Sequence, residues 1–154
     1  MTAVTVTRVE QRYLAIALPL EGSVSVQFSG RTVLVVDDEE VIRILIARAL
    51  TAAGYRVVQA THGASALAYL EDESSTVDLV VCDLVMPAMT GRDLAGWLTS
   101  HRPDVPILFI SGYPVAYLEA HGLHDPGIPL LRKPFLPSRL IESVEEALAM
   151  VGGR

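Results

Sequence analysis

The sequence predicts a doubly wound α/β domain, in which helices cover both faces of a parallel β-sheet. Short apolar runs, rich in Val, Ile and Leu and bounded by Gly, Pro, Asp or Ser, recur from Arg31 onward. Such nearly continuous apolarity is typical of parallel strands, which are buried on both faces. Stretches with helical periodicity separate the runs, and this alternation favours a doubly wound sheet. The runs are TVLVVD, YRVVQA, VDLVVCD, VPILFIS and IPLLRK.

Helices are expected between these strands and after the last one. The first is closed by Gly54, a residue suited to the left-handed conformation that ends many helices. The fourth begins at Pro114, since proline is favoured in the first helical turn. In the last, Leu140, Val144 and Leu148 recur at the spacing of a core-facing stripe. The expected ranges are 40–53, 64–73, 92–100, 114–120 and 137–150.

Length and composition predict one folded domain. The chain has 154 residues, of which 51% are hydrophobic and 19% are charged, so a packed core is expected. The net charge of −6 argues against the broad basic surface of a nucleic-acid-binding protein. Cys82 is the only cysteine, which excludes an internal disulfide and a multi-cysteine metal site. We interpret it as a small buried apolar residue.

The first thirty residues differ from the rest of the chain. The segments VTVTRV, RYLAIALPL and SVSVQF alternate like strands and predict a β-rich extension, a hairpin or small sheet, with a disordered leader as the alternative. The run YLAIALPL is too short to span a bilayer, and no secretory signal precedes it, so we expect a cytoplasmic protein without membrane insertion. The expected organisation is an extension over 1–30, a domain over 31–150 and a tail over 151–154.

Charged and polar residues stand where the predicted strands end. Asp37 and Asp38 follow the first strand, Asp83 ends the third, Ser111 ends the fourth, and Lys133 follows the fifth. The carboxyl ends of the strands in a doubly wound sheet share one edge, where ligands bind. We therefore expect these side chains to meet there.

That set of side chains predicts phosphoryl chemistry. Carboxylates held together repel one another, and a magnesium ion would relieve the repulsion. A lysine and a hydroxyl group suit the oxygens of a phosphoryl group. We infer an acyl phosphate on Asp83. Pro134, directly after Lys133, predicts a tight or cis turn that aims the lysine.

Four motifs, VLVVDDEE, LVVCDLVMPAMTG, FISGY and LRKPF, follow one another at characteristic distances. In these motifs the chain from about residue 31 to residue 150 resembles the receiver domain of bacterial two-component response regulators. The loop HGLHDPGIPLLRKPF is also similar to receivers attached to hybrid sensor histidine kinases. The resemblance implies a flavodoxin-like (βα)5 fold, with a five-stranded parallel sheet in the order 2-1-3-4-5.

Carried over by position, the resemblance assigns roles to the residues at the strand ends. Asp83 would be the phosphoacceptor, Ser111 would hydrogen-bond the phosphoryl group, and Lys133 would pair with it. Asp38 would be the more direct magnesium ligand of the acidic pair. The implied ligand set is Asp37, Asp38, Asp83 and the backbone carbonyl of Val85. Glu39 is interpreted as a charge at the helix start, with a ligand role as the alternative.

The resemblance also implies partners. Receivers take phosphate from a phosphohistidine on a sensor histidine kinase or a histidine phosphotransfer protein. They catalyse only their own phosphorylation and dephosphorylation, so no further enzyme activity is expected. Only VGGR follows the last predicted helix, so we expect no output domain. We therefore expect the signal to pass through a partner, a homodimer or a phosphorelay. Leu130 stands where receivers usually carry an aromatic residue or histidine that acts in the switch.

The first predicted helix carries more apolar residues than one buried face needs. If Ile42, Leu45, Ala49 and Leu50 fill the core, then Val41, Ile44 and Ile46 remain outside. An exposed apolar patch usually marks a contact. We expect this face to bind the phosphodonor or to be covered by the N-terminal strands.

An enzyme is the alternative of a different class. A small phosphatase of the haloacid dehalogenase type would use Asp37 as its nucleophile with magnesium. Its second acid would fall two residues later, where Glu39 fits poorly, and Asp83 would have no role. A receiver that binds partners without phosphorylation is disfavoured, because every acidic and phosphate-contacting position is filled.

Overall fold

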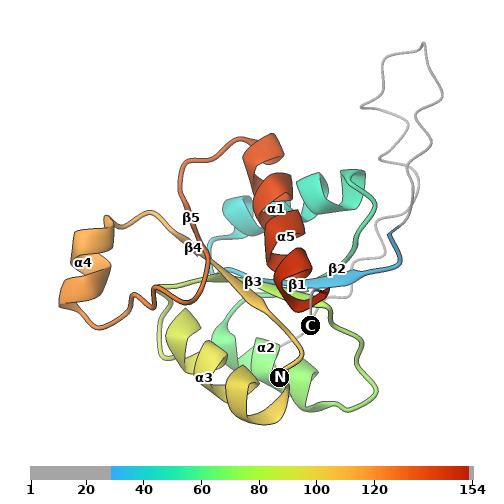
Figure 1. The fold of residues 1–154 in the computed structure, drawn as a ribbon, viewed down its shortest axis with the longest axis horizontal. Coiled ribbons are helices and arrows are strands. Elements are labelled where there is room, and N and C mark those ends of the chain that lie inside the picture. Colours follow the sequence, from blue (N-terminus) through green and yellow to red (C-terminus); the bar gives the residue numbers. More distant parts are fainter. Residues whose placement is uncertain (1–28, 153–154) are drawn as a thin grey trace.

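The computed structural model describes residues 29–152 and contains one parallel sheet of five strands in the order β2-β1-β3-β4-β5. The predicted doubly wound fold and strand order are therefore confirmed, and the fold is flavodoxin-like (Figure 1). The strands are β1 (Thr32–Val36), β2 (Arg56–Ala60), β3 (Leu79–Asp83), β4 (Ile107–Ser111) and β5 (Leu130–Arg132). The helices are α1 (Glu40–Ala52), α2 (Gly63–Glu71), α3 (Gly91–His101), α4 (Val115–Ala120) and α5 (Pro137–Gly152).

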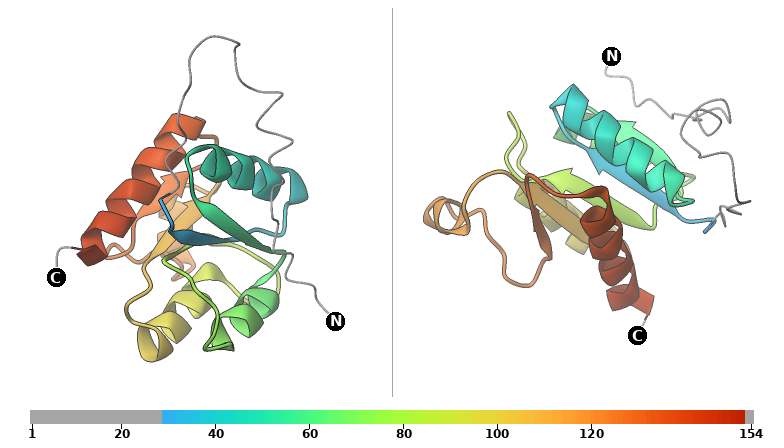
Figure 2. Two further views of the ribbon diagram at one scale, coloured as in Figure 1. Left: turned by 90° about the vertical axis from the view of Figure 1, so that its right-hand side faces the viewer. Right: turned by 90° about the horizontal axis from the view of Figure 1, so that it is seen from above.

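The helices form two layers around the sheet. Figure 2 shows α1 and α5 together on one face, and α2 and α3 on the other. Each layer closes over its own hydrophobic core, one containing Leu50 and Val144, the other Leu70 and Leu94. The short helix α4 lies beside the β4–β5 edge of the sheet (Figure 1), and its buried residue, Leu118, joins the core under α2 and α3.

Burial along the strands follows their position in the sheet. All residues of β1, β3 and β4 are buried, because each of these strands has neighbours on both sides and a helical layer on both faces. The edge strands β2 and β5 each include residues that are exposed or half-buried. Cys82 on β3 is a free, buried cysteine within the core under α2 and α3, as predicted.

Two helices begin one residue earlier than the sequence pattern predicts, because side chains cap them. The Nδ1 atom of His62 accepts a hydrogen bond from the Ser65 amide (3.1 Å), so α2 begins at Gly63. Thr90 and Asp93 form a reciprocal capping box, so α3 begins at Gly91.

The core-facing side of α1 differs from the predicted one. Leu45 was expected in the core but is 55% exposed, whereas Ile46 was expected outside and is 1% exposed. The buried stripe of α1 is Ile46, Ala47 and Leu50, so the helix is rotated relative to the expected orientation. Val41, which is 70% exposed, and Leu45 form an apolar pair on its outer face, one turn apart.

Most of the predicted N-terminal extension lies outside the described residues. Ser29 is the first residue described, and its amide donates to the carbonyl of Gly54 (3.0 Å), directly after α1. The expected strands at residues 1–28 are therefore not tested. Among residues 29–152, no helix is long and apolar enough to cross a bilayer.

Candidate functional site

The carboxyl ends of four strands bring the predicted site residues to one edge of the sheet. Asp37 follows β1 directly, Asp83 is the last residue of β3, and Ser111 is the last residue of β4. Lys133 follows β5, and its amide donates to the Ser111 carbonyl (2.9 Å), which ties the ends of β4 and β5 together. The Lys133–Pro134 peptide bond is cis, as the sequence suggested.

Lys133 is the cation at the centre of this edge. Its Nζ atom lies 3.3 Å from Asp37 Oδ2 and 3.4 Å from Asp83 Oδ2, and hydrogen-bonds both. Glu39 Oε1 lies 3.6 Å from the same Nζ atom. Asp37 and Asp83 are only 1% and 6% exposed, so the lysine is the charged partner that makes their burial tolerable.

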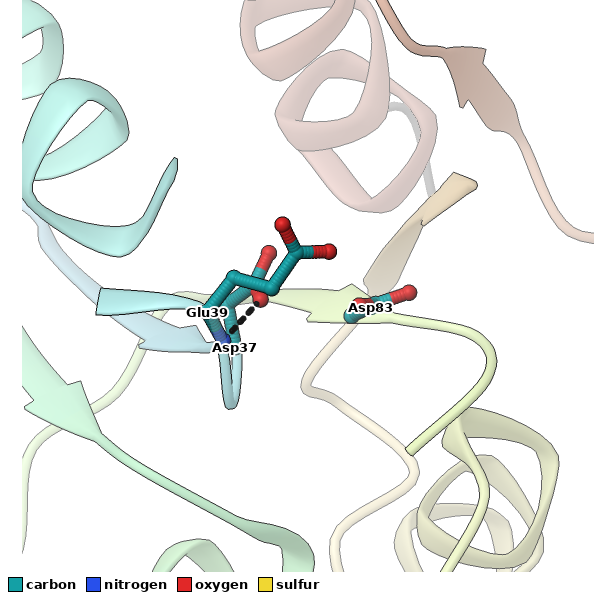
Figure 3. Close-up of side chains that lie close together, drawn as sticks. All are labelled: Asp37, Glu39 and Asp83. Carbon is teal, nitrogen blue, oxygen red and sulfur yellow. Dashed lines mark hydrogen bonds between the residues drawn. The ribbon is translucent and has the colours of Figure 1, made fainter. Parts of the chain in front are cut away.

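One lysine faces more negative charge than it can neutralise. Carboxylate oxygens of Asp37, Glu39 and Asp83 lie within 4.8 Å of one another. Figure 3 shows the Glu39 side chain extending from the loop after β1 toward the side of Asp83, with its amide bonded to Asp37 Oδ1 (2.9 Å). Oxygen donors at this spacing fit a hard divalent cation such as Mg²⁺.

The pKa values of the two buried carboxyl groups are both raised, chiefly by burial. Burial, followed by the charge of Asp37, raises the pKa of Asp83 to about 6, against the lowering effects of Lys133 and the Val85 amide. Burial also raises the pKa of Asp37. Burial alone would lower the pKa of Lys133, but the charges of Asp83 and Asp37 raise it. An added cation would favour the ionised form of both aspartates.

Asp38 and Val85, the other two expected magnesium ligands, lie on loops at the same edge. Asp38 is exposed between Asp37 and Glu39, and its carboxylate is not part of the close acidic group. Val85 lies two residues beyond Asp83, and its amide donates to Asp83 Oδ1 (3.3 Å). The roles of Asp38 and of the Val85 carbonyl stay predictions.

Ser111 is fully buried at the end of β4. Its Oγ atom accepts a hydrogen bond from the Tyr113 amide (3.1 Å). A hydroxyl group that accepts one hydrogen bond can still donate its own hydrogen to another acceptor. The strand end therefore presents a hydroxyl on the same edge as the Asp83 carboxylate.

Gly91 and Glu39 contribute to the site in ways that the sequence pattern did not predict. A Cβ atom on Gly91 would lie 2.9 Å from the Asp83 carbonyl and 3.0 Å from Leu84 Cα, so α3 can approach the end of β3 only through a glycine. The only sequence signal was a glycine at a predicted helix start. Glu39 precedes α1 and makes no side-chain cap there, because its carboxylate faces Lys133 instead.

The fold and the site together define a class of protein. A flavodoxin-like sheet with paired aspartates and a lysine at its carboxyl edge is typical of signalling domains of two-component systems. Residues 33–145 match the response regulator receiver domain, so the chain belongs to that family. Receiver domains interact with histidine kinases or histidine phosphotransfer proteins and are generally signalling modules without separate enzyme activity.

Curated relatives include proteins of different architecture. The sensor kinase CckA of Brucella abortus is 38% identical over 76% of this chain, which spans 12% of that kinase. The response regulator receiver protein CpdR of the same organism is 33% identical over 77% of this chain and 97% of its own length. The regulatory protein PhoB of Pseudomonas aeruginosa is 32% identical, and this chain spans 54% of it.

Solved structures of receivers have the same fold. A receiver protein from Sinorhizobium medicae aligns with a TM-score of 0.68 at 30% identity, over 77% of this chain and 94% of its own. The receiver domain of the hybrid histidine kinase CckA aligns with a TM-score of 0.63 at 33% identity, over 76% and 98%. The likeness to hybrid-kinase receivers is confirmed, and the family match favours the receiver over the dehalogenase-type phosphatase.

Proposed function

We propose that this chain accepts a phosphoryl group on Asp83 from a phosphohistidine of a sensor histidine kinase or a histidine phosphotransfer protein. The observation that carries the proposal is the contact between Lys133 Nζ and Asp83 Oδ2, 3.4 Å apart beside the buried Asp37. A short carboxylate fixed at a strand end, with a cation beside it, suits in-line attack on phosphorus.

The chemistry requires little beyond positioning and charge. An Asp83 oxygen attacks phosphorus, the bond from phosphorus to the imidazole nitrogen breaks, and that nitrogen keeps the electron pair. Lys133 would move from the carboxylates to the phosphoryl oxygens, since its flexible stem can follow them. The Ser111 hydroxyl would donate a hydrogen bond to the same group. Electrostatic stabilisation of this kind is the main contribution that proteins make to phosphoryl transfer.

The residues present fit Mg²⁺ as the cofactor. Buried Asp37 and Asp83 repel each other, and Glu39 adds a third carboxylate within reach. We propose Asp37, Asp38, Asp83 and the carbonyl of Val85 as the ligand set, with Glu39 close enough to hold a bound water. When bound, Mg²⁺ supplies positive charge that neutralises the phosphoryl oxygens.

The proposed output is a signal passed to a partner protein, to a second copy of the chain or along a phosphorelay. Its support is the family assignment and the likeness to CpdR, whose length this chain nearly spans. The proposal limits catalysis to the phosphorylation and dephosphorylation of Asp83 itself.

Intact-protein mass after incubation with acetyl phosphate tests the proposal. We expect wild type to gain one phosphoryl group of about 80 Da in Mg²⁺, and to gain none when Mg²⁺ is chelated. Asp83→Asn should gain nothing, because the amide is not a nucleophile for this reaction. A gain of mass in Asp83→Asn equal to that of wild type would contradict the assignment. Steady release of inorganic phosphate that depends on Asp37 and not on Asp83 would instead indicate a phosphatase.

A further inference from the structure

Arg43 reaches from the first turns of α1 back to the end of β1. Its Nη1 atom donates to the Asp37 backbone carbonyl (3.1 Å), and its Nε atom donates to Gln59 Oε1 on β2 (3.2 Å). A guanidinium group can make both bonds at once because its donors are held in a rigid plane. The side chain therefore links helix α1 to the ends of two neighbouring strands.

The carbonyl that Arg43 holds belongs to the peptide joining Asp37 to Asp38. Three further bonds fix the same loop: the Asp37 amide donates to the Ala60 carbonyl (3.2 Å), the Glu39 amide to Asp37 Oδ1 (2.9 Å), and the Arg43 amide to the Glu39 carbonyl (3.0 Å). Of the four bonds made by this loop, two involve side chains. They are the bond from Arg43 Nη1 to the Asp37 carbonyl and the bond from the Glu39 amide to Asp37 Oδ1. Arg43 thus sets the orientation of the peptide from which the exposed Asp38 projects.

We propose that Arg43 is a positioning residue for the magnesium site, and this rests on the proposed function of that site. It does not touch the reacting atoms. By fixing the Asp37–Asp38 peptide, it holds both aspartates where their oxygens can bind one cation together. Some groups orient metal ligands without binding the metal themselves. Their substitution typically lowers the affinity for the metal by about tenfold or more.

The charge of Arg43 and its positioning role predict opposite changes in Mg²⁺ affinity when the side chain is removed. A positive side chain near an acidic site repels Mg²⁺, so its removal should strengthen binding if charge were its only effect. Loss of positioning should weaken binding. Arg48 is a matched control, since it is an exposed arginine on the same helix.

The experiment is calorimetric titration of MgCl₂ into wild type, Arg43→Ala, Arg43→Lys and Arg48→Ala. We expect the Kd for Mg²⁺ to rise roughly tenfold in Arg43→Ala and to change less than about twofold in Arg48→Ala. Arg43→Lys keeps the charge but cannot reproduce the planar pair of bonds, so its Kd should also rise, by roughly threefold or more. An unchanged or lower Kd in Arg43→Ala, or a wild-type Kd in Arg43→Lys, would overturn the proposal.

Further readouts separate positioning from misfolding and from failure of the proposed function. Phosphorylation of Arg43→Ala by acetyl phosphate should approach the wild-type rate at saturating Mg²⁺, which a general structural defect would prevent. If Arg43→Ala does not fold in chelator, the Kd of Arg43→Lys for Mg²⁺ tests the proposal by itself. If wild type binds Mg²⁺ and the Arg43 variants match it, only this inference fails. If wild type binds none, the proposed magnesium site fails as well, independently of Arg43.

Discussion

Lys133 Nζ lies 3.4 Å from Asp83 Oδ2, and yet the pKa of Asp83 is raised to about 6. Burial and the neighbouring Asp37 outweigh the attraction of the lysine. The site therefore holds a carboxylate that destabilises the fold when it is ionised. Buried ionised groups that lower the stability of the fold are common at functional sites.

Asp83→Asn should stabilise the protein at pH 7 in chelator. Asp83 has a folded-state pKa of about 6, above the ordinary 3.8, so the folded state binds the proton more tightly. Its protonation stabilises the fold fully below pH 3.8, and this contribution is lost as the pH rises through 6. The variant should gain about 1–3 kcal/mol of unfolding free energy at pH 7, measured by urea denaturation.

The same comparison at low pH is the internal control for Asp83→Asn. Near pH 4 the wild-type carboxyl group is largely protonated in the folded state, so the difference between the two proteins should shrink. A stability difference that is constant from pH 4 to pH 7 would show that the gain does not come from the charge of Asp83.

Gly91→Ala should destabilise the fold and disturb the site. The new Cβ atom would lie 2.9 Å from the Asp83 carbonyl, so α3 or the end of β3 must move. We expect a loss of about 1–3 kcal/mol in chemical denaturation, with slower phosphorylation by acetyl phosphate.

Gly96→Ala is the matched control on the same helix. A Cβ atom at Gly96 would meet no atom within 4 Å apart from its chain neighbours and the adjacent backbone of its own helix, and alanine favours helix over glycine. This variant should gain about 0.5–1 kcal/mol and leave phosphorylation unchanged. Equal effects of the two substitutions would mean that the close approach at Gly91 carries no cost.

His62→Ala should weaken the start of α2. The His62 ring accepts the Ser65 amide at the N-cap position, and alanine offers no acceptor. We expect a loss of about 1 kcal/mol by thermal or urea unfolding. His62→Asn supplies a different side-chain acceptor and should keep stability near the wild-type value. A loss in the asparagine variant as large as in the alanine variant would point to ring packing and not to capping.

Val41→Glu should slow phosphoryl transfer from a phosphohistidine donor without slowing phosphorylation by acetyl phosphate. Val41 is 70% exposed and pairs with exposed Leu45 on the outer face of α1, beside the loop that carries Asp38. We expect the transfer rate to fall roughly tenfold, because a charge at an apolar contact costs about 1–2 kcal/mol of binding. The measurement is radiolabelled phosphotransfer from a purified histidine phosphotransfer domain.

Met150→Glu serves as the control for Val41→Glu. Met150 is 60% exposed near the end of α5, at the opposite end of this helix from the loop that carries Lys133. Its substitution should leave transfer unchanged. Equal slowing by both substitutions would indicate a general charge effect, and no slowing by Val41→Glu would exclude the α1 face as the donor contact.

The sequence by itself determined the architecture and the meeting of the site residues. Apolar runs buried on both faces require helices on both sides of a parallel sheet, and a parallel sheet brings its strand ends to one edge. Asp37, Asp83, Ser111 and Lys133 stand at those ends, so their convergence follows from the periodicity of the chain. The order of the strands came from resemblance to receivers and not from the pattern.

Only the tertiary structure decided how α1 is rotated, how close Glu39 comes to Lys133 and how far burial shifts the pKa of Asp83. A helix that is apolar on several sides satisfies more than one orientation, and contacts with α5 and β2 select the one that buries Ile46 and exposes Leu45. The pKa depends on the distances and burial that the packed strands impose. Local sequence does not contain those quantities, because residues distant in the chain create them.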